Sequence, residues 1–379
     1  MSHFPKPEEG SWTEHYAIDT APMSYEDSIS PEHYELERAA IFERSWLNVG
    51  RINHLRNDER RYTQDIVIAE VTVLVTEDAG GKISAFRLPI GEDSSTADLT
   101  PVQVDVWEGF IFVNLDDANT NPLRESLGKF AAGLEGFPFG EFTQRFTYRS
   151  EVGSNWKLYI DAFAEFYHAP VLHSKQYVSE ESQKLQAYGF EALYYDVDGP
   201  HGMVSSWGGM APPKDPSMVK PIERILRSGN FGPWDKPDIP GLADLPTGLN
   251  PARHPSWGLD SYVFFPNFML VMWEPGWFLT YHYWPTAYNR HTFEGTMYMA
   301  PPRNATDRLR QEIAAVTFKE FALQDSNTLE ATQKMLETRV VSEFPLCDQE
   351  ILLRHLHTSA QSMVDDYVGT HQPATTSAG

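Results

Sequence analysis

The segment from Glu165 to His173, which reads Glu-Phe-Tyr-His-Ala-Pro-Val-Leu-His, constrains the fold of this chain more than any other. His168 and His173 are five residues apart, so an unbroken helix would place them about 140° apart around its axis. Pro170 lies between them, and because proline lacks the backbone donor it predicts a break in the helix. We therefore expect His168 to end one helix and His173 to return toward it from the next turn.

Two neutral imidazoles that converge in this way can hold a divalent transition metal. The alternative is a pair of partly exposed histidines near a helix end. A third ligand would favour the metal, and residues 318–336 offer one. Their apolar side chains follow helical spacing, and Asp325 lies on the same face. The residues that define this face are Phe318, Phe321, Ala322, Leu329, Thr332 and Leu336.

Asp325 would be costly on a core-facing surface unless it were paired or bound to a metal. It could be bonded to a buried arginine or to a backbone amide. It could also join His168 and His173, and two histidines with one carboxylate form the facial triad of non-haem iron(II) oxygenases. The metal that the sequence predicts is therefore one mononuclear Fe(2+).

Several further segments resemble one known family, the alpha (large) subunits of Rieske non-haem iron aromatic ring-hydroxylating oxygenases. Its catalytic domain is similar to residues 155–157, 161–173, 264–270 and 324–333 of this chain, and its N-terminal Rieske domain is similar to residues 46–51 and 104–116. The resemblance covers about residues 25–365. It implies an α+β fold, with a truncated Rieske-like small β domain followed by a helix-grip (START-like) catalytic domain with an antiparallel sheet.

The ligands that give the Rieske domain its name are missing from the corresponding segment. A Rieske cluster needs two cysteines and two histidines around a [2Fe–2S] unit. The family places them between the strands that correspond here to residues 82–86 and 102–106, but residues 87–101 contain neither Cys nor His. The whole chain has one cysteine, Cys347. We therefore expect no [2Fe–2S] cluster of its own.

Glu165 corresponds to the family's carboxylate beside the first histidine. The resemblance implies that it bridges to a cluster in a neighbouring subunit, which would make it a catalytic residue. The alternative is that it orients His168 through a hydrogen bond, as groups that contact metal-binding histidines commonly do. The sequence leaves both roles open.

Composition and charge limit the class of protein. With 41% hydrophobic and 13% aromatic residues, the chain is not disordered as a whole. Its net charge of −23 argues against nucleic acid as a partner. The longest apolar stretch, residues 262–273, is too short to span a bilayer, the N-terminal residues do not resemble a signal peptide, and one cysteine forms no intrachain disulfide. We expect a cytoplasmic protein without a membrane partner.

The chain is expected to divide into four parts: an N-terminal arm (1–35), a degenerate Rieske-like β domain lacking cluster ligands (36–145), a non-haem iron catalytic domain (146–368) and a disordered tail (369–379). Helices are predicted for residues 31–45, 155–168 and 318–336. Strands are predicted for residues 66–75, 82–86, 102–106, 110–114, 262–273, 277–288 and 291–300.

Three functional classes follow from these expectations. In the first, the chain is an iron(II) oxygenase subunit that hydroxylates or dealkylates a small apolar aromatic or polycyclic substrate with O2. Electrons would come from a separate Rieske-bearing alpha subunit or from a ferredoxin plus reductase, within a trimer or hetero-hexamer. In the second, it is a non-catalytic structural or regulatory alpha-like subunit. In the third, it binds a ligand in its cavity without chemistry. The retained His168, His173 and Asp325 favour the first.

Overall fold

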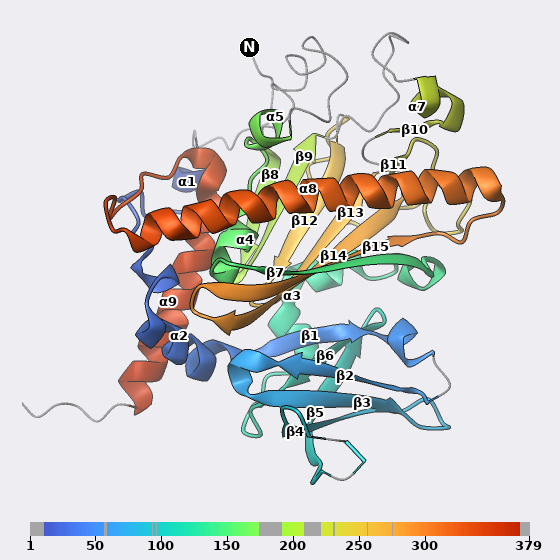
Figure 1. Cartoon of the computed structure of the whole chain (residues 1–379). Helices are drawn as coiled ribbons and strands as arrows, with labels where there is room; N and C mark the ends of the chain where they lie inside the picture. Colours follow the sequence, from blue (N-terminus) through green and yellow to red (C-terminus); the bar gives the residue numbers. More distant parts are fainter. Residues whose placement is uncertain are drawn as a thin grey trace, which may run out of the picture.

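The computed structural model describes residues 11–56, 59–92, 94–95, 97–173, 192–207, 221–229, 232–255, 257–274 and 276–371. Two antiparallel sheets organise the chain, with helices on one side of the larger sheet (Figure 1). The predicted α+β class is confirmed. Among the described residues, no helix is long and apolar enough to cross a membrane.

The smaller sheet is built from the N-terminal part of the chain and has the strand order β1-β6-β5-β4-β3-β2. The predicted hairpin around Glu108 and Gly109 is confirmed, since β5 and β6 pair from Gln103 with Asn114 to Trp107 with Phe110. The hairpin that turns at 78–81 is also present, as β3 and β4. The strands are β1 (Trp46–Arg51), β2 (Arg61–Ile66), β3 (Val71–Glu77), β4 (Ile83–Pro89), β5 (Thr100–Trp107) and β6 (Phe110–Asn114).

The larger sheet has the order β7-β15-β14-β13-β12-β9-β8, and every neighbouring pair is antiparallel. Its strands are β7 (Gln144–Val152), β8 (Ala192–Asp198), β9 (His201–Trp207), β12 (Trp257–Phe264), β13 (Phe268–Trp273), β14 (Trp277–Ala287) and β15 (Arg290–Met299). A separate short ribbon is formed by β10 (Ser228–Gly229) and β11 (Gly232–Pro233).

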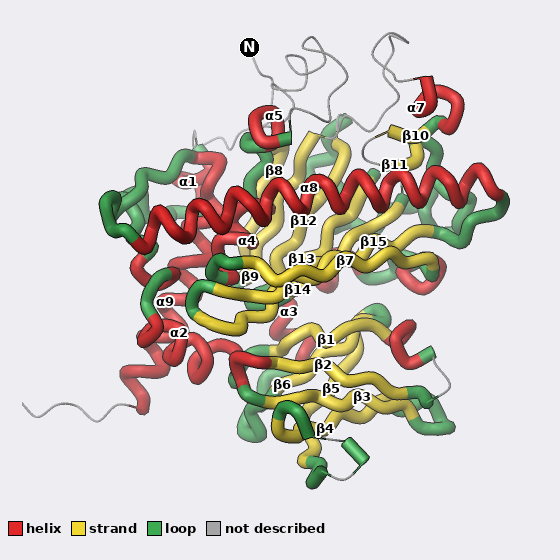
Figure 2. The backbone as a smooth tube through the Cα atoms, viewed as in Figure 1, coloured by secondary structure: helices red, strands yellow, loops and turns green. Residues whose placement is uncertain are grey.

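Helices cover one face of the larger sheet, and α8 (Ala305–Glu337) runs along it (Figures 1 and 2). Asn304 begins α8 by accepting a hydrogen bond from the Asp307 amide, as N-cap residues do. The other helices are α1 (Trp12–His15), α2 (Pro31–Glu37), α3 (Leu123–Leu134), α4 (Trp156–Phe163), α5 (Ala169–Leu172), α7 (Pro221–Leu226) and α9 (Ile351–His371).

Side chains of the larger sheet alternate between its two faces, as they must in any strand. Tyr281 of β14 stacks on Phe318 of α8, with ring centroids 5.9 Å apart. The next residue, His282, points the other way, and its Nε2 lies 2.7 Å from Oδ1 of Asn48 in the smaller sheet. The larger sheet is therefore covered by helices on one face and meets the small domain on the other.

The two domains are joined by buried polar contacts. Asn267 accepts a hydrogen bond from the Asn48 amide and donates one to its carbonyl, at 3.1 and 2.9 Å. The guanidinium of Arg51, 1% exposed, lies over the rings of Phe110, Phe278 and Tyr298 at 4.7, 5.1 and 4.7 Å. Arg51 also donates to the Phe139 carbonyl at 3.0 Å, so its guanidinium is held between the two sheets.

Several predicted elements differ from the structure, and the helix expected over 318–336 is longer, since α8 begins at Ala305. The helix expected over 155–168 ends at Phe163, because the following residues turn before α5 begins. The strand expected over 262–273 is two strands, β12 and β13, joined by the turn that contains Pro266 and Asn267. The strand expected over 66–75 is interrupted by a 3₁₀ turn at Val67–Ala69, where Glu70 adopts the left-handed conformation.

The N-terminal segment packs on the larger sheet where it is described. Trp12 is buried and lies edge-on to Tyr194 and Tyr195, each at 5.6 Å. At the other end, α9 continues to His371, three residues into the tail expected to be disordered. Residues 1–10 and 372–379, which belong to the predicted arm and tail, lie outside the described residues.

Candidate metal centre

A single helical turn brings His168 and His173 together. His168 precedes α5 and His173 follows it, and the His168 carbonyl accepts hydrogen bonds from the amides of Val171 and Leu172 at 3.0 and 2.9 Å. The two imidazole centroids are 5.3 Å apart. The predicted convergence is present, but its cause differs from the expectation. Pro170 lies in the first turn of α5, where proline is well tolerated, and so it starts a helix instead of ending one.

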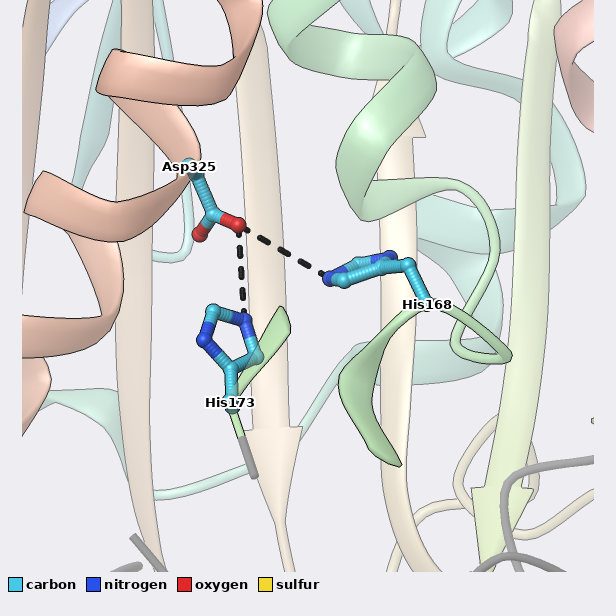
Figure 3. Close-up of side chains that lie close together, drawn as sticks. All are labelled: His168, His173 and Asp325. Carbon is cyan, nitrogen blue, oxygen red and sulfur yellow. Dashed lines mark ion pairs between the residues drawn. The ribbon is translucent and has the colours of Figure 1, made fainter. Parts of the chain in front are cut away.

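Asp325 reaches the same point from α8 (Figure 3). Its Oδ1 lies 3.4 Å from Nε2 of His173 and 3.8 Å from Nε2 of His168. Donor atoms bound to one ion at roughly 2.0–2.2 Å cannot be much more than about 4.2 Å apart, so both distances fit a shared metal. The potential ligand atoms of all three residues lie within 4.8 Å of one another.

The carboxylate of Asp325 is buried, and the residue is 1% exposed. Among the described residues neither carboxylate oxygen has a hydrogen-bond partner, and its close neighbours are the two imidazoles. In the part of the chain that is described, neither a buried arginine nor a backbone amide pairs with Asp325 as the alternative from the sequence required. An isolated buried carboxylate is costly, and a bound cation removes that cost. The residues present therefore fit a divalent metal ion.

The outward nitrogen of each imidazole is held by a neighbouring side chain. Glu165 places Oε1 2.5 Å from Nδ1 of His168 and accepts the His168 amide with Oε2 at 3.1 Å. Nδ1 of His173 lies 2.6 Å from Oε1 of Gln324. Since carboxylate and amide oxygens only accept, both rings carry the proton on Nδ1. Both Nε2 lone pairs are then free to bind a metal, as in histidine metal sites generally.

The carboxylates of Glu165 and Asp325 also change the pKa of His168. Burial alone would lower the pKa of His168, but its hydrogen bond to Glu165 and the charges of Glu165 and Asp325 raise the pKa above the ordinary value. The cluster is therefore electronegative, and the same carboxylates that attract a proton would attract a metal cation.

Aromatic rings surround the cluster on the helix-covered face of the sheet. Phe321 of α8 lies edge-on to His173 at 4.7 Å. Phe163, at the end of α4, lies 4.7 Å from Tyr281 of β14. The hydroxyl of Tyr159 donates to the Ala322 carbonyl at 3.1 Å and so ties α4 to α8 one turn before Asp325.

A second group of titratable side chains lies beside α4, and no motif in the sequence predicted it. Asp27, His33 and Glu37 are close enough to hold an ion. The ammonium group of Lys157 neutralises these carboxylates instead of an ion. Lys157 is fully buried and forms ion pairs with Glu37 and, at 3.5 Å, with Asp27. We therefore interpret the group as a structural salt-bridge cluster.

Asp161 belongs to that buried cluster and not to the candidate metal centre. Its Oδ2 lies 3.0 Å from Nε2 of His357 in α9, whose Nδ1 lies 2.9 Å from Asp27. The three residues come from α4, α9 and the N-terminal segment, and no spacing in the sequence relates them. Cys347, the one cysteine, is exposed.

The fold and the candidate metal centre point to a class of protein, and comparison with known proteins identifies the family. Residues 139–366, more than half of the chain, match the family described as ring hydroxylating alpha subunit (catalytic domain). The chain belongs to this family.

Individual relatives are more distant. The carnitine monooxygenase oxygenase subunit of Escherichia coli (strain K12) is 34% identical over 84 residues, 21% of this chain and only 22% of that protein's length. A quaternary ammonium Rieske monooxygenase has a TM-score of 0.65 at 14% identity, covering 94% of this chain and 99% of its own. Naphthalene 1,2-dioxygenase from Rhodococcus sp. has a TM-score of 0.62 at 15% identity, covering 95% and 96%. At such identities, the structures show a shared fold.

Proposed function

We propose that the chain is a non-haem iron(II) oxygenase subunit in which His168, His173 and Asp325 hold one Fe(2+). One observation carries the proposal. Asp325 is a buried carboxylate without a hydrogen bond among the described residues, and it is placed between two imidazole nitrogens that are oriented toward it. A structural or ligand-binding role alone would give no physical reason to bury a carboxylate without a hydrogen bond, which costs free energy. When bound, iron supplies the redox chemistry that O2 activation requires.

The electrons are proposed to come from another protein. The connection between β4 and β5 consists of residues 90–99, and neither Cys nor His occurs there. With one cysteine in the sequence, the chain cannot provide the two thiolates of a Rieske cluster. A Rieske-bearing alpha subunit, or a ferredoxin plus reductase, would then complete the system, and a trimer or hetero-hexamer is the proposed assembly.

Glu165 is proposed to position His168. Both of its carboxylate oxygens contact His168, one at Nδ1 and one at the backbone amide. These contacts fix the tautomer and the direction of Nε2. The bridge to a partner's cluster is the competing role, and the cavity of about 310 Å³ that Glu165 and Asp161 line would be the place for it. The two roles predict different results for the same substitution, as argued below.

The proposed substrate is a small apolar aromatic or polycyclic compound that is hydroxylated or dealkylated with O2. The rings of Phe163, Tyr281 and Phe321 near the cluster support an apolar ligand. Aromatic rings also bind quaternary ammonium ions through cation–π contacts. A quaternary ammonium compound is therefore the second candidate, and the carnitine monooxygenase relative favours it.

The decisive experiment measures metal first and turnover second. The purified chain should bind about one iron without acid-labile sulfide, because the triad provides one mononuclear site. With a reductase alone it should not turn over, and a Rieske-bearing partner should restore activity. Naphthalene and carnitine, assayed in parallel, would separate the two substrate classes. A chain that binds no iron and remains inactive with every partner would be the structural or regulatory subunit. A Rieske-type visible spectrum from the chain alone would contradict the argument from its cysteine count.

A further inference from the structure

A second cavity, of about 350 Å³, lies between the small domain and the face of the larger sheet that points away from α8. The small domain contributes His54 and Tyr62, and the larger sheet contributes Arg145, Arg149, His282 and Glu294. None of these residues belongs to the candidate metal centre. The cavity is on the opposite side of the sheet from the triad.

The register of the sheet explains why the charged residues gather there. Arg149 of β7 pairs with Glu294 of β15, and Glu294 pairs with His282 of β14. Arg145 lies four residues before Arg149 on the same strand and therefore on the same face. The strand period thus lines up two guanidinium groups, one carboxylate and one imidazole under the small domain.

The balance of charge in the cavity is positive, although the protein carries a net charge of −23. Arg145 and Arg149 are exposed at the rim, and neither forms an ion pair within 4.0 Å with a described residue. Burial raises the pKa of Glu294, and the two arginines act against that rise. Burial, with nearby positive groups, lowers the pKa of His54 to about 4, and burial lowers that of His282 to about 3, so both imidazoles are neutral.

Two residues that line the cavity each have a polar atom without a hydrogen-bond partner among the described residues. The hydroxyl of Tyr62 and Nδ1 of His282 are both buried, and neither has a hydrogen bond in the part of the chain that is described. Buried polar groups are nearly always bonded, so two such atoms in one cavity indicate a ligand or ordered water. The lack of a side chain at Gly50 makes room for His54 and the Tyr62 hydroxyl. A Cβ there would lie 2.7 Å from Nδ1 of His54 and 3.0 Å from the Tyr62 hydroxyl.

The hydrogen-bonding sense of His282 is fixed by its other nitrogen. Asn48 Oδ1 accepts from the Gly50 amide at 3.1 Å, which identifies it as the oxygen, so His282 Nε2 donates to it. In a neutral ring, Nδ1 must then be an acceptor. The cavity therefore offers donors at Arg145, Arg149 and Tyr62, and an acceptor at His282.

We propose that this cavity binds a small oxyanion that also carries an O–H group, such as hydrogen phosphate or a hydroxycarboxylate. The anionic oxygens would accept from the guanidinium groups and the Tyr62 hydroxyl, while the O–H donates to His282 Nδ1. Sulfate and simple carboxylates carry the charge without the O–H at neutral pH, so they match the cavity less well. The proposal involves none of the iron-site residues and stands independently of the function above.

The test is calorimetric titration of the full chain at constant ionic strength with two matched pairs of anions. Inorganic phosphate is compared with sulfate, and glycolate with acetate. We expect saturable binding of the hydroxyl-bearing member of one pair, at least about tenfold tighter than its match. Phosphate alone binding would identify a phosphate site, and glycolate alone a hydroxycarboxylate site. Equal weak heats from all four anions would overturn the proposal and leave non-specific surface charge.

Variants assign the binding to the cavity. Arg149→Gln and Tyr62→Phe should each weaken it, whereas Glu294→Gln should tighten it because a like charge is removed. Arg290→Gln is the matched control, since Arg290 is an exposed residue of the same sheet that does not line the cavity. Thermal unfolding of each variant verifies folding. Unchanged affinity in folded Arg149→Gln and Tyr62→Phe, or weaker binding by Glu294→Gln, would contradict the assignment.

Discussion

Nδ1 of His173 lies 2.6 Å from Oε1 of Gln324, the residue that directly precedes Asp325 in α8. One turn of α8 therefore supplies a proposed ligand and also orients another. Because an amide oxygen accepts, the proton of His173 is kept on Nδ1, and the Nε2 lone pair faces Asp325. The position of α5 is in this way tied to that of α8.

The first prediction concerns this contact. Gln324→Leu should weaken iron binding by roughly 10–100-fold, because loss of a group that orients a metal-binding histidine typically has that effect. Equilibrium titration with Fe(2+) under anaerobic conditions measures it. Gln324→Glu keeps an acceptor oxygen at the position and should retain most of the affinity. Gln361→Leu is the control, since Gln361 is an exposed residue of α9. Equal affinity for Gln324→Leu and wild type would remove Gln324 from the site.

The second prediction concerns the cost of the unpaired carboxylate of Asp325. At alkaline pH, above the raised pKa of His168, Asp325→Asn should raise the thermal stability of the metal-free protein, because it removes a buried charge that no imidazolium then offsets. The same change should abolish the stabilisation that iron gives to wild type. Differential scanning calorimetry with and without Fe(2+) checks both effects. A lower melting temperature for the metal-free variant would show that Asp325 is stabilised by a contact other than a metal.

Asp325 also shows how much of the site was predictable from the sequence. Its place on an apolar helical face predicted burial, and the spacing of His168 and His173 predicted convergence. The role of Gln324 was not predictable, because its contact with His173 joins residues 151 positions apart. The sequence did predict the hairpins and residues 318–336 of α8, since period-2 and helical patterns are local. It missed the end of α4 at Phe163, because the residues that follow are compatible with a helix and turn only in their tertiary context.

The third prediction separates the two roles of Glu165. If Glu165 orients His168, Glu165→Gln should weaken iron affinity by roughly 10–100-fold, because the charged partner of Nδ1 is lost. If it bridges to a partner's cluster, iron affinity should be unchanged while delivery of electrons slows. Iron titration tests the first role. Comparing turnover driven by hydrogen peroxide with turnover driven by the electron-donating partner tests the second. Wild-type behaviour in every assay would exclude Glu165 from both roles.

The buried cluster of Asp27, Asp161 and His357 beside α4 gives a prediction that does not depend on iron. His357 lies between Asp27 and Asp161, at 2.9 and 3.0 Å. Although burial lowers its pKa, the charges of Asp161 and Asp27 and their hydrogen bonds raise it to about 10. The folded state therefore binds the His357 proton more tightly than the unfolded chain, whose histidine pKa is about 6.5.

The sign of the pH dependence follows from that difference. A pKa raised by folding stabilises the protein fully below the unfolded value, and this contribution is lost as pH rises through the folded value. His357→Gln removes the cation that lies between Asp27 and Asp161 and leaves only Lys157 beside Asp27, so the variant should be less stable than wild type. The difference in the free energy of unfolding between wild type and His357→Gln should be largest near pH 6. It should shrink steadily toward about pH 10, as wild-type His357 loses its proton. Urea unfolding at several pH values measures it, with the exposed pair Arg339 and Glu26 tested through Arg339→Gln as a control that should show little change. A gap that stays constant, or widens with pH, would mean that His357 is neutral in the folded protein.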